Sequence, residues 1–176
     1  MIARGADGRS SPVKDGDDVS LVFPPQGGRV IFAGVRATNL DPCAVKLSGA
    51  LRDETSLNVR VDTRTVNLKP TGDGWGASLD TDISSFSNVP TCPNQWADTD
   101  VFDHEFELTL TVTERGGRSA TQTLKVKPRC AEPAREAECR CICKRGYVLG
   151  EACAGSDAGP ADGGVDATSD VSAEGG

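Results

Sequence analysis

The sequence has little of the chemistry that enzymes and nucleic-acid-binding domains need. Its 176 residues include one histidine, one tyrosine and one methionine, and only 5% are aromatic. The single histidine, His104, cannot define a catalytic triad among many serines, and the G-x-S-x-G motif of serine hydrolases is absent. Lysines and arginines form no cluster, which argues against nucleic acid or an anionic membrane surface as a partner. We therefore expect a protein that is not an enzyme and needs no cofactor.

Long apolar segments are also missing. The residues from Met1 to Asp18 are polar and glycine-rich, with no run that could form the core of a signal peptide or a transmembrane span. Seven cysteines nevertheless favour disulfides, which need an oxidising compartment. We resolve this conflict by expecting an extracellular or cell-envelope protein whose export signal or membrane anchor was lost upstream. The alternative is a cytosolic protein with reduced thiols.

The negative charge is concentrated at the C-terminal end. The formal net charge is −7, but residues 154–176 hold five acidic residues and no lysine or arginine, which leaves −2 for the rest of the chain. This segment is rich in Gly, Ala and Asp and contains no aromatic residue. We predict a disordered acidic tail over 154–176.

Short segments of alternating polarity dominate the rest of the chain. The clearest runs from Phe106 to Val112, where apolar residues alternate with Glu and Thr, and a Gly116-Gly117 turn then leads into a partner strand over 120–126. No segment has the helical period of a core helix. The sequence predicts an all-β fold, an immunoglobulin-like antiparallel β-sandwich of about seven strands over 17–129, preceded by a flexible leader over 1–16.

Two parts of this region resemble known families. Residues 104–113 and 119–127, with the glycine turn between them, resemble the last two strands of bacterial immunoglobulin-like, cadherin-like and polycystic-kidney-disease-type domains. Three further motifs resemble an uncharacterised extracellular domain of bacterial lipoproteins and secreted proteins: Pro25-Gln26-Gly27-Gly28, Arg36-Ala37 and Leu51-Arg52-Asp53. The first resemblance implies the fold and the second implies a location in the cell envelope.

A cysteine-rich segment follows over 130–153. It has almost no apolar content, so cross-links or a metal must order it. We expect Cys92 and Cys130 to meet at one end of the sandwich, and Cys43, at the other end, to be the free thiol. The candidates for disulfides are Cys92, Cys130, Cys139, Cys141, Cys143 and Cys153.

Two other interpretations apply to this cysteine-rich segment. Cys141-x-Cys143-x-x-Gly146-Tyr147 followed by Cys153 resembles the final loop of an epidermal growth factor-like module, which implies a short hairpin pinned by disulfides. A zinc site with the thiolates of Cys139, Cys141, Cys143 and Cys153 as ligands is the alternative, but the single-residue spacings between the first three are tight for regular zinc ligands. A short helix over 133–138 is expected to precede the cysteines.

The remaining candidate sites are for binding and metal coordination. An exposed tryptophan on a sandwich can stack on a sugar or anchor a protein partner, and Trp96, in the longest loop, is the main candidate, with Trp75 at a strand start. Asp98, Asp100 and Asp103 supply carboxylate oxygens that calcium uses in many sandwich modules. We therefore expect a non-catalytic module that binds a protein or glycan at the cell surface or acts as a structural spacer, with a zinc- or calcium-dependent interaction module as the alternative.

Overall fold

The computed structural model describes residues 1–153, and within them it confirms the all-β fold. Within these 153 residues the single α-helix is α1 (Glu136–Cys143), and 3-10 turns span Ile83–Ser85 and Pro133–Arg135. The strands are β1 (Ile2–Arg4), β2 (Ser10–Pro12), β3 (Asp17–Ser20), β4 (Arg29–Gly34), β5 (Arg36–Ala37), β6 (Val45–Arg52), β7 (Val59–Val66), β8 (Lys69–Pro70), β9 (Gly76–Ala77), β10 (Ser87–Cys92), β11 (Phe106–Thr113) and β12 (Ser119–Arg129). The predicted tail over 154–176 lies outside the described residues.

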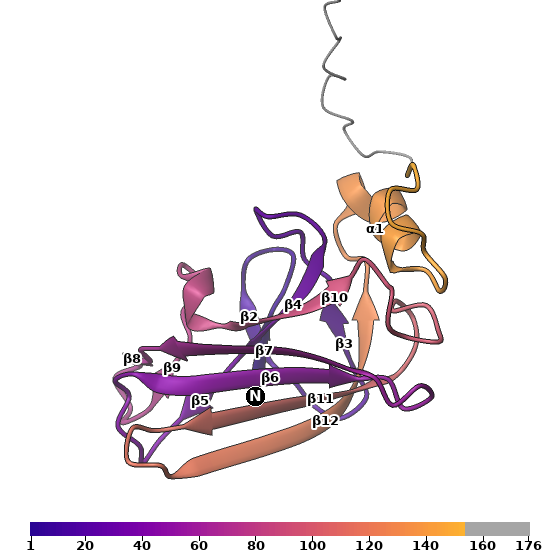
Figure 1. Ribbon diagram of the computed structural model, residues 1–176. Helices are drawn as coiled ribbons and strands as arrows, with labels where there is room; N and C mark the ends of the chain where they lie inside the picture. Colours follow the sequence, from indigo (N-terminus) through magenta and orange to yellow (C-terminus); the bar gives the residue numbers. More distant parts are fainter. Residues whose placement is uncertain (154–176) are drawn as a thin grey trace, which may run out of the picture.

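The strands form two larger sheets and one small one. The larger sheets have the orders β3-β12-β11-β6-β7 and β10-β4-β1-β2, and the small sheet has the order β5-β9-β8 (Figure 1). Ile31 and Val89 from the second sheet share a buried cluster with Leu51 and Leu108 from the first. The core therefore lies between the two larger sheets, as in a β-sandwich.

The alternating pattern of β11 sets the inner and outer faces of the five-stranded sheet. Its apolar residues from Phe106 to Val112 are buried, and the intervening threonines are partly exposed. Strand β12 runs antiparallel to it, with Phe106 opposite Val126 and Thr113 opposite Ser119. The predicted hairpin is confirmed.

The N-terminal residues differ from the expected flexible leader. Strand β1 pairs with β4, where Ala3 lies opposite Ala33, and it pairs on its other side with β2. Ala3 and Val13 are both buried. The sequence did not predict these short strands, because the glycines and aspartates around them interrupt any alternating pattern. The segment is ordered by pairing with β4, a strand about 30 residues away in the sequence.

The cysteine-rich segment also differs from expectation, because Cys139, Cys141 and Cys143 lie on a helix and not on a hairpin. Residues of good helix propensity fill α1, and a proline opens the preceding 3-10 turn. Cys139 and Cys143 are one turn apart on its buried face. The helix thus turns two cysteines toward the sandwich.

That helix decides the disulfide pairing. Cys92 bonds to Cys143 and not to Cys130 as expected, Cys130 bonds to Cys139, and Cys141 bonds to Cys153. The expectation considered only the two ends of the sandwich strands, whereas α1 folds back and carries Cys143 to Cys92. Cys43 is the free cysteine of the described residues, and it is exposed. Three disulfides indicate a non-reducing environment. No helix within residues 1–153 has the length and apolar content to cross a membrane.

Candidate functional site

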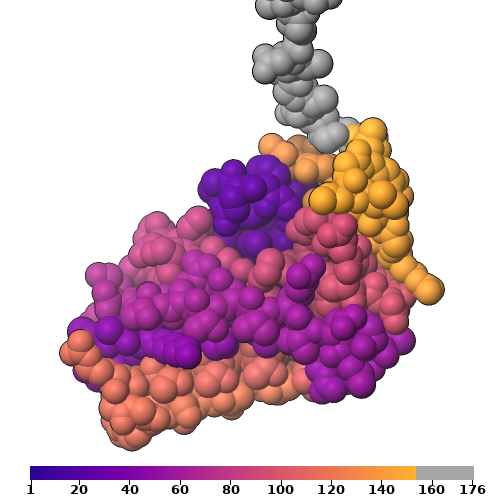
Figure 2. All heavy atoms as spheres, in the orientation of Figure 1, coloured from indigo at the N-terminus to yellow at the C-terminus, as the bar shows by residue number. Residues whose placement is uncertain are grey.

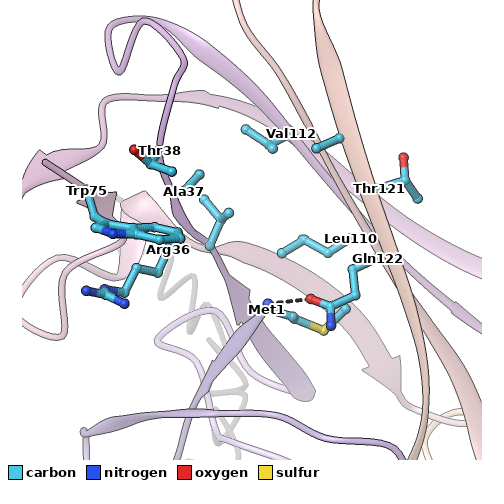
Figure 3. Close-up of a pocket in the computed structure, with 11 residues that line it drawn as sticks. Met1, Arg36, Ala37, Thr38, Trp75, Leu110, Val112, Thr121 and Gln122 are labelled. Carbon is cyan, nitrogen blue, oxygen red and sulfur yellow. Dashed lines mark hydrogen bonds between the residues drawn. The ribbon is translucent and has the colours of Figure 1, made fainter.

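A pocket of about 290 Å³ opens between the small sheet and the β11–β12 hairpin. Figure 3 shows Trp75, Arg36, Ala37 and Thr38 on one side of it and side chains of β11 and β12 on the other. Its lining consists of Met1, Val35, Arg36, Ala37, Thr38, Trp75, Leu110, Val112, Ala120, Thr121 and Gln122. The small sheet lies at the opposite end of the molecule from α1 (Figure 1).

A tight turn places Trp75 at the wall of this pocket. Gly72 and Gly74 both have a φ of 83°, which favours glycine, and they flank Asp73 in the loop between β8 and β9. The backbone N–H of Trp75 donates to Asp73 Oδ1 at 3.2 Å, and the N–H of Thr71 donates to the Trp75 carbonyl at 2.9 Å. The Gly-Asp-Gly sequence therefore fixes the backbone from which the indole projects.

Arg36 holds the indole ring in place. Its guanidinium lies 4.7 Å from the ring centroid of Trp75, and it also forms an ion pair with Asp73. The hydrogen bond from Thr71, together with those from the Trp75 N–H and Arg36, lowers the pKa of Asp73 from its ordinary value. Asp73 is therefore ionised at neutral pH and links the turn to the cation that stacks on the tryptophan.

Trp75 separates this pocket from a second one. The second pocket, of about 410 Å³, is formed by the loops on either side of the small sheet, and it shares Ala37, Thr38 and Trp75 with the first. Trp75 is 37% exposed, in contrast with the buried aromatic residues of the core. Its indole is thus available at the boundary of two adjoining hollows.

The chemistry of the first pocket suits binding. Val35, Leu110 and Val112 form apolar walls, while Thr38 and Gln122 add polar groups that can accept or donate hydrogen bonds. The 11 lining residues include no histidine, cysteine or carboxylate that could serve as a nucleophile or general base. Met1 donates a hydrogen bond from its amino group to Gln122 Oε1 at 2.6 Å.

The structure places Trp96 in the core, so it is not the exposed binding residue expected from the sequence. It is only 8% exposed, its Nε1 donates to the Thr91 carbonyl at 2.8 Å, and its ring lies 5.7 Å from that of Phe106. Asn94 folds the long loop back by accepting a hydrogen bond from the Ala97 N–H. The exposed tryptophan is Trp75, and the Gly-Asp-Gly turn before it was the available signal.

The three loop aspartates do not converge on a metal site. Asp98 donates its backbone N–H to Asp53, and Asp100 Oδ1 accepts the backbone N–H of Arg145 at 2.7 Å. Asp103 binds two guanidiniums, those of Arg129 and Arg140. The hydrogen bond from Arg129, with a further contribution from Arg140, lowers the pKa of Asp103. These carboxylates therefore serve the loop and its contact with α1.

Within residues 1–153, the one set of three or more potential metal ligands whose ligand atoms all lie within 4.8 Å of one another is Cys130, Cys139 and Cys143. All three are joined in disulfides, so none of them offers a thiolate to a metal in this oxidised state. The zinc interpretation, with Cys139, Cys141, Cys143 and Cys153 as ligands, would require reduction of all three disulfides. Comparison of the chain with protein-family models, with curated proteins and with solved structures found no match.

Proposed function

We propose that this protein is a non-catalytic, extracellular or cell-envelope binding module that recognises a protein or glycan through the pocket beside Trp75. The observation that carries the proposal is the partly exposed indole of Trp75, held by Arg36 between two adjoining pockets. Tryptophan and arginine are the residue types that most often dominate binding energy at interfaces. A rigid aromatic wall beside an apolar pocket also suits the apolar face of a sugar.

Strand order supports an immunoglobulin-like assignment for the sandwich. The consecutive strands β11 and β12 lie beside β6, and β6 continues the sheet to β7. This order is the one expected when strands C, F and G of an immunoglobulin-like domain are extended by C′. Strand β3 joins the same sheet parallel to β12. We therefore propose an immunoglobulin-like module with the cysteine-rich segment at one end and the small β5-β9-β8 sheet at the other (Figure 1), where Arg36 and Ala37 of β5 line the Trp75 pocket.

Truncation of the indole tests the site. We expect Trp75→Ala to weaken binding by about thirtyfold, because an anchoring aromatic residue at an interface contributes about 2 kcal/mol or more. The measurement is binding to arrays of glycans and of cell-surface proteins, followed by titration of each hit. Leu57→Ala is the matched control, because Leu57 is an apolar residue that is 60% exposed and lies outside both pockets. Equal binding by both variants would overturn the assignment of the site.

The proposed location is tested by counting thiols. We expect intact mass spectrometry of the native protein, exported to an oxidising compartment, to show alkylation of one thiol, at Cys43. After reduction and unfolding, all seven cysteines should react. If all seven become alkylated without reductant once the protein is unfolded, and zinc accompanies the native protein, the secreted module is wrong and the metal-dependent alternative replaces it.

A further inference from the structure

One edge of the five-stranded sheet is incompletely covered. Strand β12 extends over Ser119–Arg129, but β3 pairs only with its last residues, from Val126 to Arg129. Lys125 is covered as well, because its N–H donates to Asp15 Oδ1 and its carbonyl accepts the N–H of Gly16, each at 2.8 Å. Within the described part of the chain, no strand pairs with this edge over residues 119–124. Figure 1 shows β12 along the margin of the sheet, with β3 near only its end.

The alternation of a strand fixes where the backbone groups of this free edge point. Since the N–H and carbonyl of Lys125 face away from β11, those of Thr123 and Thr121 do so too. The side-chain hydroxyls of Thr123 and Thr121 lie on the outer face of the sheet, where they form hydrogen bonds with the hydroxyls of Thr109 and Thr111, at 2.9 Å in both cases. Thr121 and Thr123 are both exposed. Two N–H groups and two carbonyls are thus directed out of the edge in the geometry of a strand.

The opposite edge of the same sheet is protected against pairing. The inward-facing side chains of β7 include Arg60, Asp62 and Arg64, and inward charges are a common way to block addition of a strand. Asp62 also accepts the N–H of Asn88 on β10 at 2.9 Å, which closes β7 against the second sheet. By contrast, residues 119–124 read Ser-Ala-Thr-Gln-Thr-Leu, with no charge and no proline. The free edge of β12 therefore lacks the usual protection.

The pocket beside Trp75 lies directly along this free edge. Ala120, Thr121 and Gln122 line it from β12, while Val35 and Trp75 line it from the other side. A strand added to β12 would direct alternate side chains toward the pocket and the others toward the outer threonines. Figure 2 shows the β11–β12 hairpin along the lower margin of the molecule, away from the cysteine-rich segment. The edge and the pocket form one continuous surface.

We propose that this surface binds an extended polypeptide segment by strand addition to residues 119–124 of β12. The inference rests on the proposed function, and it names the ligand of the Trp75 pocket. Main-chain hydrogen bonds to Thr121 and Thr123 hold the segment, and the pocket selects an uncharged, apolar side chain at an inward position. Small or hydroxyl-bearing residues suit the outward positions, which lie beside threonines. The partner is therefore a protein with an accessible, extended segment of alternating polarity.

The experiment selects peptides from a phage-displayed random library on the immobilised full chain. We expect the selected peptides to alternate apolar and small polar residues, and to slow amide hydrogen exchange at Thr121 and Thr123. Thr121→Pro removes an edge N–H that β11 does not use, so the fold should survive while peptide affinity falls about tenfold or more. Thr121→Ala is the matched control, since it loses the hydroxyl but keeps the N–H. Gln122→Lys, which adds a charge at the edge, provides a second variant if the proline variant does not fold.

The outcomes separate this inference from the proposed function. Peptides that bind equally well to Thr121→Pro and Thr121→Ala, or leave the exchange of both edge amides unchanged, overturn strand addition. A library that yields no binding peptide also overturns strand addition. If glycans bind and lose affinity on Trp75→Ala in either of these cases, the binding module stands with a different ligand. If neither peptides nor arrayed partners depend on Trp75, both proposals fail.

Discussion

Replacing Glu138 by glutamine is expected to lower the free energy of unfolding by about 3–5 kcal/mol, the usual effect of removing one partner of a buried ion pair. Arg29 is fully buried, and its Nη2 lies 3.2 Å from Glu138 Oε2 on α1. Arg135 approaches the same carboxylate at 3.4 Å, and both guanidiniums stack on Phe23. Without the carboxylate of Glu138, the guanidiniums of Arg29 and Arg135 would lie together on the Phe23 ring with no negative charge between them. The buried Arg29 would then lack its counter-ion.

Two controls define this effect, measured as the free energy of unfolding in denaturant titrations. Glu136→Gln removes the exposed partner of Arg140 on the same helix, at 2.9 Å, and should change stability by no more than about 0.5 kcal/mol. The double variant Arg29→Met, Glu138→Gln removes the buried charge as well and should recover much of the loss. If Glu138→Gln is as mild as Glu136→Gln, the ion pair does not hold α1 to the sandwich.

Loss of the disulfide between Cys92 and Cys143 is expected to have an effect of similar size. The two residues are 51 apart in sequence, so the cross-link removes about 4 kcal/mol of loop entropy from the unfolded chain. Both side chains are buried in the cluster that also holds Trp96, so alanines at these positions also leave unfilled space. The double variant Cys92→Ala, Cys143→Ala should therefore lose a large share of the stability of a domain of this size.

The disulfide between Cys141 and Cys153 provides the comparison. Its residues are 12 apart, so the same argument gives about 3 kcal/mol, and neither cysteine belongs to the buried cluster. Fluorescence of Trp96 during denaturant unfolding measures both variants, with Trp75→Phe as the background to remove the second signal. A smaller loss for the Cys92 and Cys143 pair than for the outer pair would contradict the view that the inner disulfide secures the end of the sandwich.

Together, the buried ion pair and the inner disulfide attach the cysteine-rich segment to one end of the sandwich. Arg29 lies at the start of β4 and Cys92 at the end of β10, two neighbouring strands of one sheet. Asp103 adds a surface contact through Arg140 of α1. The Trp75 pocket and the free edge of β12 lie away from this attachment, so that variants at the two ends should act independently.

The sequence by itself determined the features that depend on neighbouring residues. Alternation from Phe106 to Val112 and the glycine turn after it were enough to predict the β11–β12 hairpin, because successive side chains of a strand face opposite sides. The all-β class followed from the absence of any long helical period. The richness in cysteine was sufficient to predict disulfides, though not their partners.

Only the tertiary structure decided which distant residues meet. Cys92 pairs with Cys143 because α1 folds back on the sandwich, and a disulfide depends on the separation of two Cα atoms in space, here 5.2 Å. Likewise, Trp96 is buried because the loop that carries it folds back onto the core, and the residues beside it in the sequence do not reveal this packing. The free edge of β12 is also decided by tertiary structure, because it begins where β3 stops pairing with β12. Pairing between strands that are remote in the sequence leaves no local pattern from which it could be predicted.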